Sequence, residues 1–328
     1  MSQVLQQLES AWQLRLKFKL HLGNQALRVF HGPGEGIGGF RSVSIDRFGD
    51  VKGAHFWVTV WEEDGSFLSP EELKLISSFL KSKDAASAVL LRRPKKGTPD
   101  EPVPLLGLPP QERIAIIEND LRFKIQLLGT RHPGLFLDHQ PLRQWLAQNL
   151  DRKRVLNTFA YTGSLSVAAQ KSGADSVITL DLSAPSIAWA KENWALNGFS
   201  FARAEFMTGD VFEWLPKWAK RGERFDCVIL DPPSFSRGKK GNFSTSKDLK
   251  KLHELALGVL SPDGFLVTSI NSAKVSRAQY EKEIAAAASA TSVKLKMLYE
   301  IELPKSFPTR PQAPPSDRYL KGWVLKRC

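Results

Sequence analysis

Four apolar runs in the second half of the chain each end at a polar residue, and segments with helical spacing lie between them. The runs span residues 155–157, 176–180, 201–207 and 225–230. Their polar ends are Asn157, Asp181, Asp210 and Asp231. Apolar residues recur at helical intervals in 164–169 and 183–197. Short apolar runs that alternate with helices predict a parallel sheet in an α/β domain.

The same reading extends to the C-terminus. We expect a helix over residues 247–260, a fifth strand over 264–270 and an Ala-rich helix over 278–290. Two last strands are predicted at 297–303 and 319–326. The Pro-rich segment 304–315 between them is expected to form an ordered or mobile rim of the site.

The first half of the chain has a different pattern. Residues 1–27 have apolar positions at helical spacing followed by basic residues, which predicts a helical arm that docks on the body or reaches RNA. Residues 28–128 contain predicted strands at 43–46, 55–61 and 89–92 and a helix at 70–80. We therefore expect a small α+β domain at 28–128 for substrate or RNA binding, and a larger α/β domain at 129–328.

A glycine-rich segment, GPGEGIGG at 32–39, matches the formal pattern G-x-G-x-x-G. A dinucleotide-binding fingerprint must open a helix, whereas the residues that follow here alternate as in a strand. We reject the fingerprint and expect a flexible loop.

The composition is that of a soluble globular protein, with 42% hydrophobic and 24% charged residues. No apolar run approaches the ~20 residues of a membrane span, and no secretory signal is visible, so a cytoplasmic protein is expected. Two cysteines fit a reducing compartment, and six scattered histidines give no metal-ligand spacing. We therefore expect no bound metal ion. The sequence does not indicate the oligomeric state.

The net charge of +12 indicates a polyanionic partner, because contacts with phosphates release counterions. Basic residues cluster in two places, one of them directly after Asp231-Pro232-Pro233-Ser234-Phe235. A charge run is usually a solvated face, but one beside a predicted site favours a substrate clamp. The predicted RNA-binding residues are Arg92, Arg93, Lys95, Lys96, Arg237, Lys239 and Lys240.

Carboxyl ends of parallel strands gather at one edge of a sheet, where α/β proteins bind ligands. The turn at Gly163 leaves backbone N–H groups at the start of a helix, and Asp181 stands where an acid can hold ribose hydroxyls. One glycine alone would fit an ordinary βα loop. Polar residues at four successive strand ends indicate a nucleoside-like cofactor.

At this point the sequence resembles the class I S-adenosylmethionine-dependent methyltransferases, in particular the bacterial group that modifies bases of large-subunit (23S) ribosomal RNA. The resemblance runs from about Phe40 to the C-terminus. Its motifs are SIDRFGD (44–50), GLFLDHQPLR (134–143), NTFAYTGS (157–164), DPPSFS (231–236) and YLKG (319–322). It implies a Rossmann-like seven-stranded sheet with S-adenosylmethionine as cofactor and RNA as partner. Related enzymes often carry a further N-terminal RNA-binding domain, for which we expect no room here.

The resemblance also implies site residues. The loop at 134–143 would lie over the cofactor, with Arg143 suited to its methionine carboxylate, while Gln140 replaces a usual second basic residue. The implied cofactor contacts are Phe136, Asp138, Arg143, Asn157, Phe159, Tyr161, Gly163, Asp181, Leu182, Asp210, Val211 and Asp231. Asp138 also fits a helix cap, which alone would explain it.

Methyl transfer is an in-line displacement, so the protein mainly positions and desolvates the two partners. Asp231, Pro232 and Asn271 are expected to hold a base edge while Phe235 stacks on the base. The alternative is that Asp-Pro-Pro only makes a rigid turn. These four residues are the predicted catalytic set.

The acceptor is predicted to be a guanine nitrogen. Carbon 5 of cytosine needs a cysteine nucleophile, and the stretch after the fifth strand, Ser269-Ile270-Asn271-Ser272, has none. Cys227 lies in an apolar strand and is predicted to be a core residue. The resemblance is closer to the branch that methylates guanine at N7. Open alternatives are a cytosine-C5 enzyme, an N-methyltransferase for protein or small-molecule amines, and an RNA-binding protein without activity.

Overall fold

The computed structural model describes residues 2–17, 25–50, 53–62, 68–94, 97, 100–238, 241–272, 274–309 and 319–328. The chain forms two compact units. Unit 1 comprises Met1–Gln140 and Leu303–Asp317, and unit 2 comprises Pro141–Glu302 and Arg318–Cys328. This division differs from the predicted boundaries at residues 27 and 128, because the N-terminal helix and a late segment both belong to unit 1.

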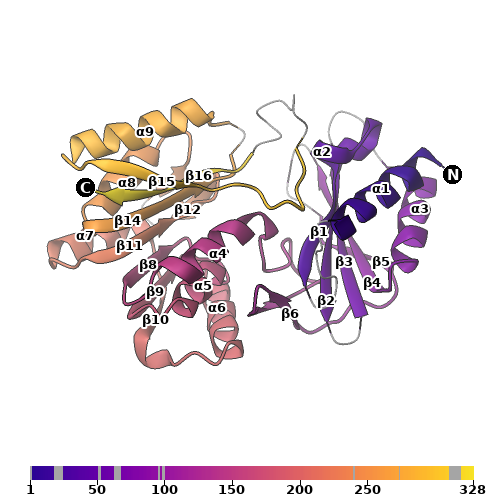
Figure 1. Ribbon diagram of the computed structural model, residues 1–328, viewed down its shortest axis with the longest axis horizontal. Helices are drawn as coiled ribbons and strands as arrows, with labels where there is room; N and C mark the ends of the chain where they lie inside the picture. Colours follow the sequence, from indigo (N-terminus) through magenta and orange to yellow (C-terminus); the bar gives the residue numbers. More distant parts are fainter. Residues whose placement is uncertain are drawn as a thin grey trace. The chain divides into compact units, whose positions relative to one another are not determined.

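Unit 1 contains a five-stranded sheet in the order β1-β2-β3-β4-β5. Strands β3 and β4 are parallel, and the other neighbours are antiparallel. Helices α1 and α3 pack together beside the sheet (Figure 1). The bounds are α1 (Gln3–Lys17), β1 (Ala26–His31), β2 (Val43–Asp50), β3 (Gly53–Glu62), α3 (Pro70–Lys81), β4 (Ala85–Pro94) and β5 (Val103–Leu106).

The N-terminal helix α1 is part of the core of unit 1. Leu8, Ala11 and Trp12 are buried in it, and Trp12 makes an edge-to-face contact with Phe79 of α3 at 6.2 Å between ring centroids. Helix α3 begins with a capping box between Ser69 and Glu72, which satisfies two backbone N–H groups. The apolar spacing of residues 1–27 thus corresponds to packing on the body.

A hairpin follows in unit 1. Strands β6 (Ile114–Glu118) and β7 (Leu121–Ile125) are joined by Asn119 and Asp120, which have φ of +50° and +65°. Two positive φ angles are those of a type I′ turn, and Asn and Asp tolerate them well. Asn119 and Asp120 therefore form the turn of a separate two-stranded sheet.

The glycine-rich segment is not the flexible loop that we expected. It forms a short helix, α2 (Gly32–Glu35), and a 3-10 helix, η1 (Gly38–Ser42). A Cβ on Gly34 would lie 1.7 Å from the carbonyl oxygen of Pro308. Glycine is required there because another stretch of backbone packs directly against it.

That stretch is the beginning of the Pro-rich segment, and three contacts fasten it to unit 1. The fully buried Arg15 donates a 2.7 Å hydrogen bond from Nη2 to the carbonyl of Ser306. The ring of Phe307 lies 4.2 Å from the guanidinium of Arg28 and 5.2 Å from the ring of His31. Residues 304–309 are thus packed, and residues 310–315 of the predicted rim lie outside the described part of the chain.

Unit 2 contains the seven-stranded sheet, in the order β10-β9-β8-β11-β14-β16-β15 (Figure 1). The first five strands in this order are parallel to one another. At the edge of the sheet, β16 pairs antiparallel with both β14 and β15. The strand bounds are β8 (Arg154–Thr158), β9 (Ser176–Asp181), β10 (Ala204–Thr208), β11 (Phe225–Leu230), β14 (Leu260–Ile270), β15 (Leu295–Glu300) and β16 (Lys321–Arg327). The predicted Rossmann-like α/β fold is confirmed.

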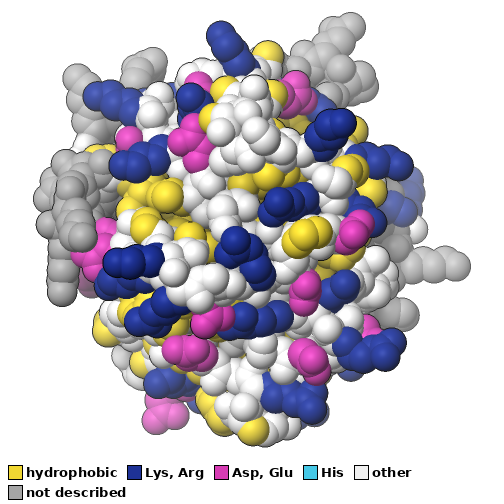
Figure 2. All heavy atoms as spheres, turned by 90° about the vertical axis from the view of Figure 1, so that its left-hand side faces the viewer, with side chains coloured by type: hydrophobic (Ala, Val, Ile, Leu, Met, Phe, Trp, Pro, Cys, Tyr) yellow, Lys and Arg dark blue, Asp and Glu magenta, His cyan; other side chains and the backbone are white. Residues whose placement is uncertain are grey.

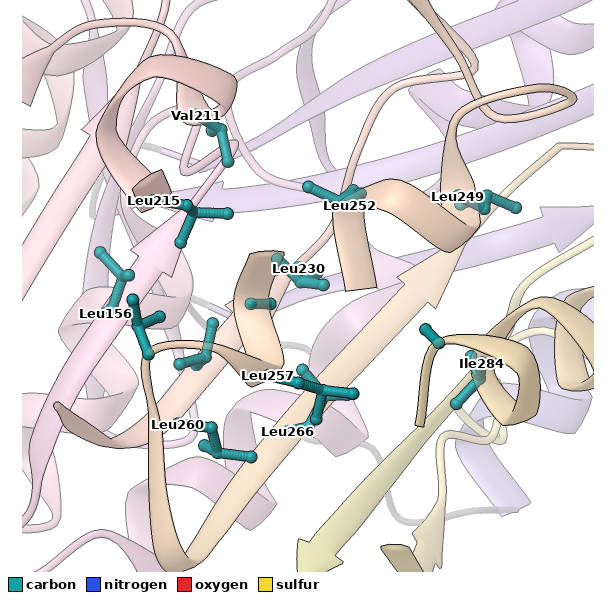
Figure 3. Close-up of a cluster of buried hydrophobic side chains, with 14 of the residues drawn as sticks. Leu156, Val211, Leu215, Leu230, Leu249, Leu252, Leu257, Leu260, Leu266 and Ile284 are labelled. Atoms are coloured by element: carbon teal, nitrogen blue, oxygen red, sulfur yellow. The ribbon is translucent and has the colours of Figure 1, made fainter. Parts of the chain in front are cut away.

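Helices cover the sheet of unit 2 and bury its apolar side chains. Leu215, Leu252 and Ile284, from α7, α8 and α9, belong to one buried cluster with the leucines of β11 and β14 (Figure 3). The helices are α4 (Gln140–Asn149), α5 (Ser164–Lys171), α6 (Ala184–Leu196), α7 (Val211–Lys220), α8 (Leu249–Leu257) and α9 (Arg277–Ala290). In the described part of the chain no helix is long and apolar enough to span a bilayer.

Two local features of unit 2 differ from the sequence reading. Residues 201–203 form a 3-10 helix, η3 (Phe201–Arg203), before β10, where we predicted a continuous strand. Ser200 caps this turn by accepting a hydrogen bond from the N–H of Ala202 at 3.2 Å. The hairpin of β12 (Phe235–Gly238) and β13 (Gly241–Ser244) was not predicted.

Candidate functional site

The polar residues predicted at strand ends lie on four adjacent strands. The sheet order β10-β9-β8-β11 places Asp210, Asp181, Asn157 and Asp231 along one edge, at or just after the carboxyl ends of parallel strands. This is the edge at which α/β sheets bind ligands. Residues that are far apart in the sequence therefore lie at the ends of neighbouring strands.

The loop between β8 and α5 has an uncommon backbone. Phe159, Tyr161 and Gly163 have φ of +54°, +49° and +72°. A Cβ on Gly163 would also lie 2.8 Å from Cβ of Ala190 in α6. Positive φ in two aromatic residues costs free energy, and such strain concentrates at functional sites. The strained backbone marks this loop as part of a site.

Hydrogen bonds hold the loop in place. The N–H of Tyr161 donates to Oδ2 of Asp181 at 2.8 Å, and the N–H of Ala160 donates to the carbonyl of Leu180 at 3.1 Å. From α6, Nδ2 of Asn193 donates to the carbonyl of Thr162 at 2.9 Å. The loop is therefore fixed to both β9 and α6.

Asp181 is oriented by backbone groups. Its Oδ1 accepts from the N–H of Ser183 at 2.8 Å, while Oδ2 accepts from Tyr161. Burial raises the pKa of Asp181, and the hydrogen bonds from Ser183, Tyr161 and Leu182 partly offset this effect. Each carboxylate oxygen keeps further acceptor capacity, so the group can still hold two hydroxyls.

Asn157 offers an acceptor inside the protein. The residue is fully buried, and its Nδ2 donates to Oγ of Ser166 at 2.9 Å. Thr179 donates to the same Ser166 oxygen at 2.8 Å. Among the described residues, Oδ1 of Asn157 has no hydrogen-bond partner. A buried acceptor of this kind fits a ligand that brings a donor.

Two of the predicted cofactor contacts, Asp210 and Val211, also stabilise the fold. Oδ1 of Asp210 accepts from the N–H of Phe212 at 2.9 Å and so caps α7. The side chain of Val211 is buried in the core of unit 2. Leu182, in contrast, is 41% exposed just after β9. A cofactor contact at Asp210 would use the acceptor capacity that the cap leaves.

Asp231 follows β11 and is held by the neighbouring strand. Its Oδ1 accepts a 2.6 Å hydrogen bond from Oγ of Ser269 in β14. Pro232 is buried, whereas Asn271 is exposed just beyond the end of β14. The predicted catalytic residues Asp231 and Asn271 thus follow two adjacent strands.

The β12–β13 hairpin directs Phe235 outward. Phe243 of β13 is buried, with its ring 5.9 Å from that of Phe159 and 5.5 Å from that of Phe212. Phe235 pairs with Ser244, one residue from Phe243, so its side chain projects to the opposite face. It is 52% exposed. An exposed aromatic ring four residues after Asp231 in the sequence suits stacking on a base.

Three predicted cofactor contacts lie within a few residues, in the sequence, of the point where unit 1 passes into unit 2. Phe136 and Asp138 belong to unit 1, and Arg143 lies in α4 of unit 2. Phe136 is 36% exposed, and Asp138 lies in the 3-10 helix η2 (Leu137–His139), with Oδ1 3.2 Å from Nδ1 of His139. Arg143 is buried. Their part in cofactor binding stays a prediction.

The predicted RNA-binding residues are described only in part. Arg92 donates to Glu62 at 3.1 Å, and Arg93 donates to the carbonyl of Arg131 at 3.0 Å, so both also serve unit 1. Figure 2 shows Lys and Arg side chains spread over one face of the molecule, with acidic side chains among them. Outside the described part lie the side chain of Arg237 and all of Lys95, Lys96, Lys239 and Lys240.

Sequence reasoning missed two polar groups next to the site. One is Ser269, the partner of Asp231. The other is a buried chain of contacts from His253 through Thr268 to Tyr280. The only signal in the sequence was the Thr-Ser pair that interrupts the apolar strand before Asn271. Cys227 is fully buried, and burial raises the pKa of its thiol, in agreement with a core residue.

Residues 27–317 match the family model of the S-adenosylmethionine-dependent methyltransferases, and the chain belongs to this family. The predicted enzyme class and the cofactor, S-adenosylmethionine, are thereby confirmed. The buried acceptor on Asn157 and the oriented carboxylate of Asp181 fit this cofactor, which has an ammonium group and two ribose hydroxyls.

Among its relatives is YwbD of Bacillus subtilis (strain 168), provisionally named as a ribosomal RNA large subunit methyltransferase. It is 30% identical over 328 aligned positions, and the alignment covers 98% of this chain and 80% of YwbD. Ribosomal RNA large subunit methyltransferase I of Vibrio parahaemolyticus is 34% identical over 236 residues. That match covers 71% of this chain and 59% of the relative, so the chain matches less than two thirds of that protein.

A similar solved structure is the crystal structure of SMU.776, a provisionally assigned methyltransferase complexed with SAH. It has a TM-score of 0.86 and 26% sequence identity, over 98% of this chain and 80% of SMU.776. A provisionally assigned SAM-dependent methyltransferase from Streptococcus mutans has a TM-score of 0.85 and 25% identity, with the same coverage. Both alignments extend through both units of the chain.

Proposed function

We propose that the chain methylates a base of large-subunit ribosomal RNA and that the acceptor is a ring nitrogen of guanine, N7. Two relatives carry names that refer to large-subunit ribosomal RNA. The net charge of +12 supports a polyanionic substrate. Two observations carry the proposal: Ser269 fixes the carboxylate of Asp231, and the ring of Phe235, four residues further along the chain, is exposed.

The nature of the acceptor follows from the groups that the site offers. Attack by cytosine carbon 5 requires a thiolate that first adds to the ring. Residues 269–272 supply hydroxyl and amide groups there instead of a thiol, and Cys227 is buried in β11. A ring nitrogen such as N7 has its own lone pair and loses no proton on methylation. The site therefore needs no general base and no covalent nucleophile.

The residues of the chain then divide the work. The bound cofactor supplies a methyl group on a positively charged sulfur. Asp181 and Asn157 orient that cofactor, Asp231 and Asn271 hold the polar edge of the base, and Phe235 stacks on its face. Catalysis in this scheme comes from positioning and from exclusion of water, which together can contribute several kcal/mol.

The test is transfer of tritium from labelled S-adenosylmethionine to ribosomal RNA, for the wild type, Asp231→Ala and Asp263→Ala. Asp263 is a matched control, because it is an exposed acid on β14 that pairs with Lys326. We expect loss of transfer only in Asp231→Ala. Mass mapping of the labelled RNA identifies the methylated atom, and an acceptor other than guanine nitrogen would contradict the N7 assignment.

The same assay separates the alternatives. Label in protein or in small amines, with none in RNA, would favour an amine methyltransferase. Binding of RNA without transfer would favour an inactive RNA-binding protein. Binding measured across salt concentrations should show the steep dependence that phosphate contacts produce.

A further inference from the structure

We infer that the YLKG motif, Tyr319–Gly322, positions the two groups that hold the methyl acceptor, Asp231 and Asn271. Ser269 and Lys321 carry this action as positioning residues. The inference rests on the proposed function, and it assigns a role to a motif that contributes no predicted contact with cofactor or base.

The first step is the geometry of Ser269. Its hydroxyl is buried, and Oγ donates to Oδ1 of Asp231 at 2.6 Å. Hydrogen bonds to a charged acceptor are shorter and stronger than neutral ones. Asp231 lies directly after the end of β11, and this hydrogen bond connects its side chain to β14. Ser269 thus fixes Oδ1 of Asp231. Because the carboxylate is planar and rigid, fixing Oδ1 also restricts the position of Oδ2.

The second step is the space that Ser269 occupies. In the antiparallel pair of β14 and β16, Ser269 lies opposite Gly322. A Cβ on Gly322 would come within 2.9 Å of Cβ of Ser269 and 2.6 Å of the carbonyl oxygen of Thr268. Only glycine at this position leaves Ser269 in its place. The last residue of the motif therefore makes room for the group that holds Asp231.

The third step concerns Lys321, which lies opposite Ile270. Its Nζ donates to the carbonyl of Ser272 at 2.9 Å and to the carbonyl of Tyr319 at 3.1 Å. Ser272 directly follows Asn271, so the ammonium group ties the backbone next to Asn271 to the start of β16. This tie adds to the sheet bonds that hold the end of β14.

Together, these contacts make the positions of Asp231 and Asn271 depend on β16. Gly322 admits Ser269, Ser269 orients Asp231, and Lys321 holds the segment that carries Asn271. Displacement of a reacting group by about 1 Å can cost about 100-fold in rate. Loss of either contact should therefore slow the chemical step, while Asn157 on β8 and Asp181 on β9, which are expected to hold most of the cofactor, keep their places.

The experiment compares Ser269→Ala and Lys321→Met with two controls on the same strands, Ser261→Ala on β14 and Lys326→Met on β16. The readouts are the single-turnover rate of methyl transfer to ribosomal RNA, the Kd of SAH by calorimetry and the melting temperature. We expect the two site variants to be about 10- to 100-fold slower, with the Kd of SAH changed by less than about twofold. The controls should match the wild type.

Ser269→Cys provides a conservative rescue, because its S–H group is a weak donor of similar size. Its rate should lie between those of the wild type and Ser269→Ala. Should Ser269→Ala fail to fold, the cysteine variant and Lys321→Met still decide the matter. Rates equal to the wild type in these variants would overturn the inference, as would a loss of SAH affinity equal to the loss of rate.

Failure of this inference differs from failure of the proposed function. A wild type that transfers no methyl group to RNA would refute the function and, with it, the role given to Ser269 and Lys321. A wild type that transfers normally, accompanied by equally fast variants, would refute the positioning role alone.

Discussion

The buried histidine of unit 2 makes the stability of the protein depend on pH in a way that can be calculated. Nδ1 of His253 lies 2.7 Å from the carbonyl of Leu249. A carbonyl only accepts, so Nδ1 carries the proton of the neutral ring. Nε2, 2.9 Å from Oγ1 of Thr268, is then the acceptor, and Thr268 in turn contacts the hydroxyl of Tyr280. A second proton on Nε2 would place a positive charge in a fully buried site and would require the Thr268 hydroxyl to turn and accept.

The sign and size of the effect follow from the pKa. Burial lowers the pKa of His253 from 6.5 to about 4. The unfolded chain therefore binds a proton at a higher pH than the folded protein, and stability is lost as the pH falls below about 6.5. Between pH 7 and pH 5 this single residue should cost about 2 kcal/mol.

The assay is urea unfolding of the wild type and of His253→Gln at pH 7 and pH 5. The glutamine does not titrate, so the variant should lose about 2 kcal/mol less than the wild type over this interval. His31, with a pKa lowered to about 3, contributes equally to both proteins and cancels. An equal loss in the two proteins would refute the assignment of a neutral, hydrogen-bonded His253.

Three further outcomes are expected. Phe235→Ala should weaken RNA binding by about 1–3 kcal/mol, the contribution of one stacked base, in fluorescence anisotropy, and unchanged binding would argue against stacking. Gly163→Ala should lower both the melting temperature and the affinity for SAH. A left-handed φ costs about 1–2 kcal/mol in residues other than glycine, and the added methyl group would meet Ala190. Normal SAH affinity would show that the loop tolerates the change. Arg15→Met should destabilise unit 1 by about 3–5 kcal/mol in calorimetry, since it leaves the partly buried Glu35 without its ion-pair partner, and a loss under about 1 kcal/mol would contradict this.

Much of unit 2 could be predicted because local pattern and tertiary structure agree there. The apolar run at Phe225–Leu230 is β11 with the same bounds. Parallel strands buried on both faces are continuous apolar runs, and each ends at a residue that the ligand-binding edge requires. Asp181 and Asp231 could therefore be selected as site residues from their places in the pattern.

The missed features depend on contacts between distant parts of the chain. Glycines at 32–39 have the composition of a flexible loop, and only the backbone of Pro308 shows why Gly34 must be glycine. Ser269 lies inside an apolar strand, and its importance depends on a carboxylate that is 38 positions away in the sequence. Local composition contains no information on such pairings.

The buried guanidinium of Arg15 has a consequence for how the protein is made. Its hydrogen bond to Ser306 spans 291 positions of the sequence. Domains of growing chains usually fold in order from the N-terminus as the ribosome releases them. Here unit 1 is completed only when a segment 291 positions beyond Arg15 has been synthesised. A nascent chain stalled before Ser306 should leave unit 1 open to proteases, even though most of unit 1 precedes unit 2 in the sequence.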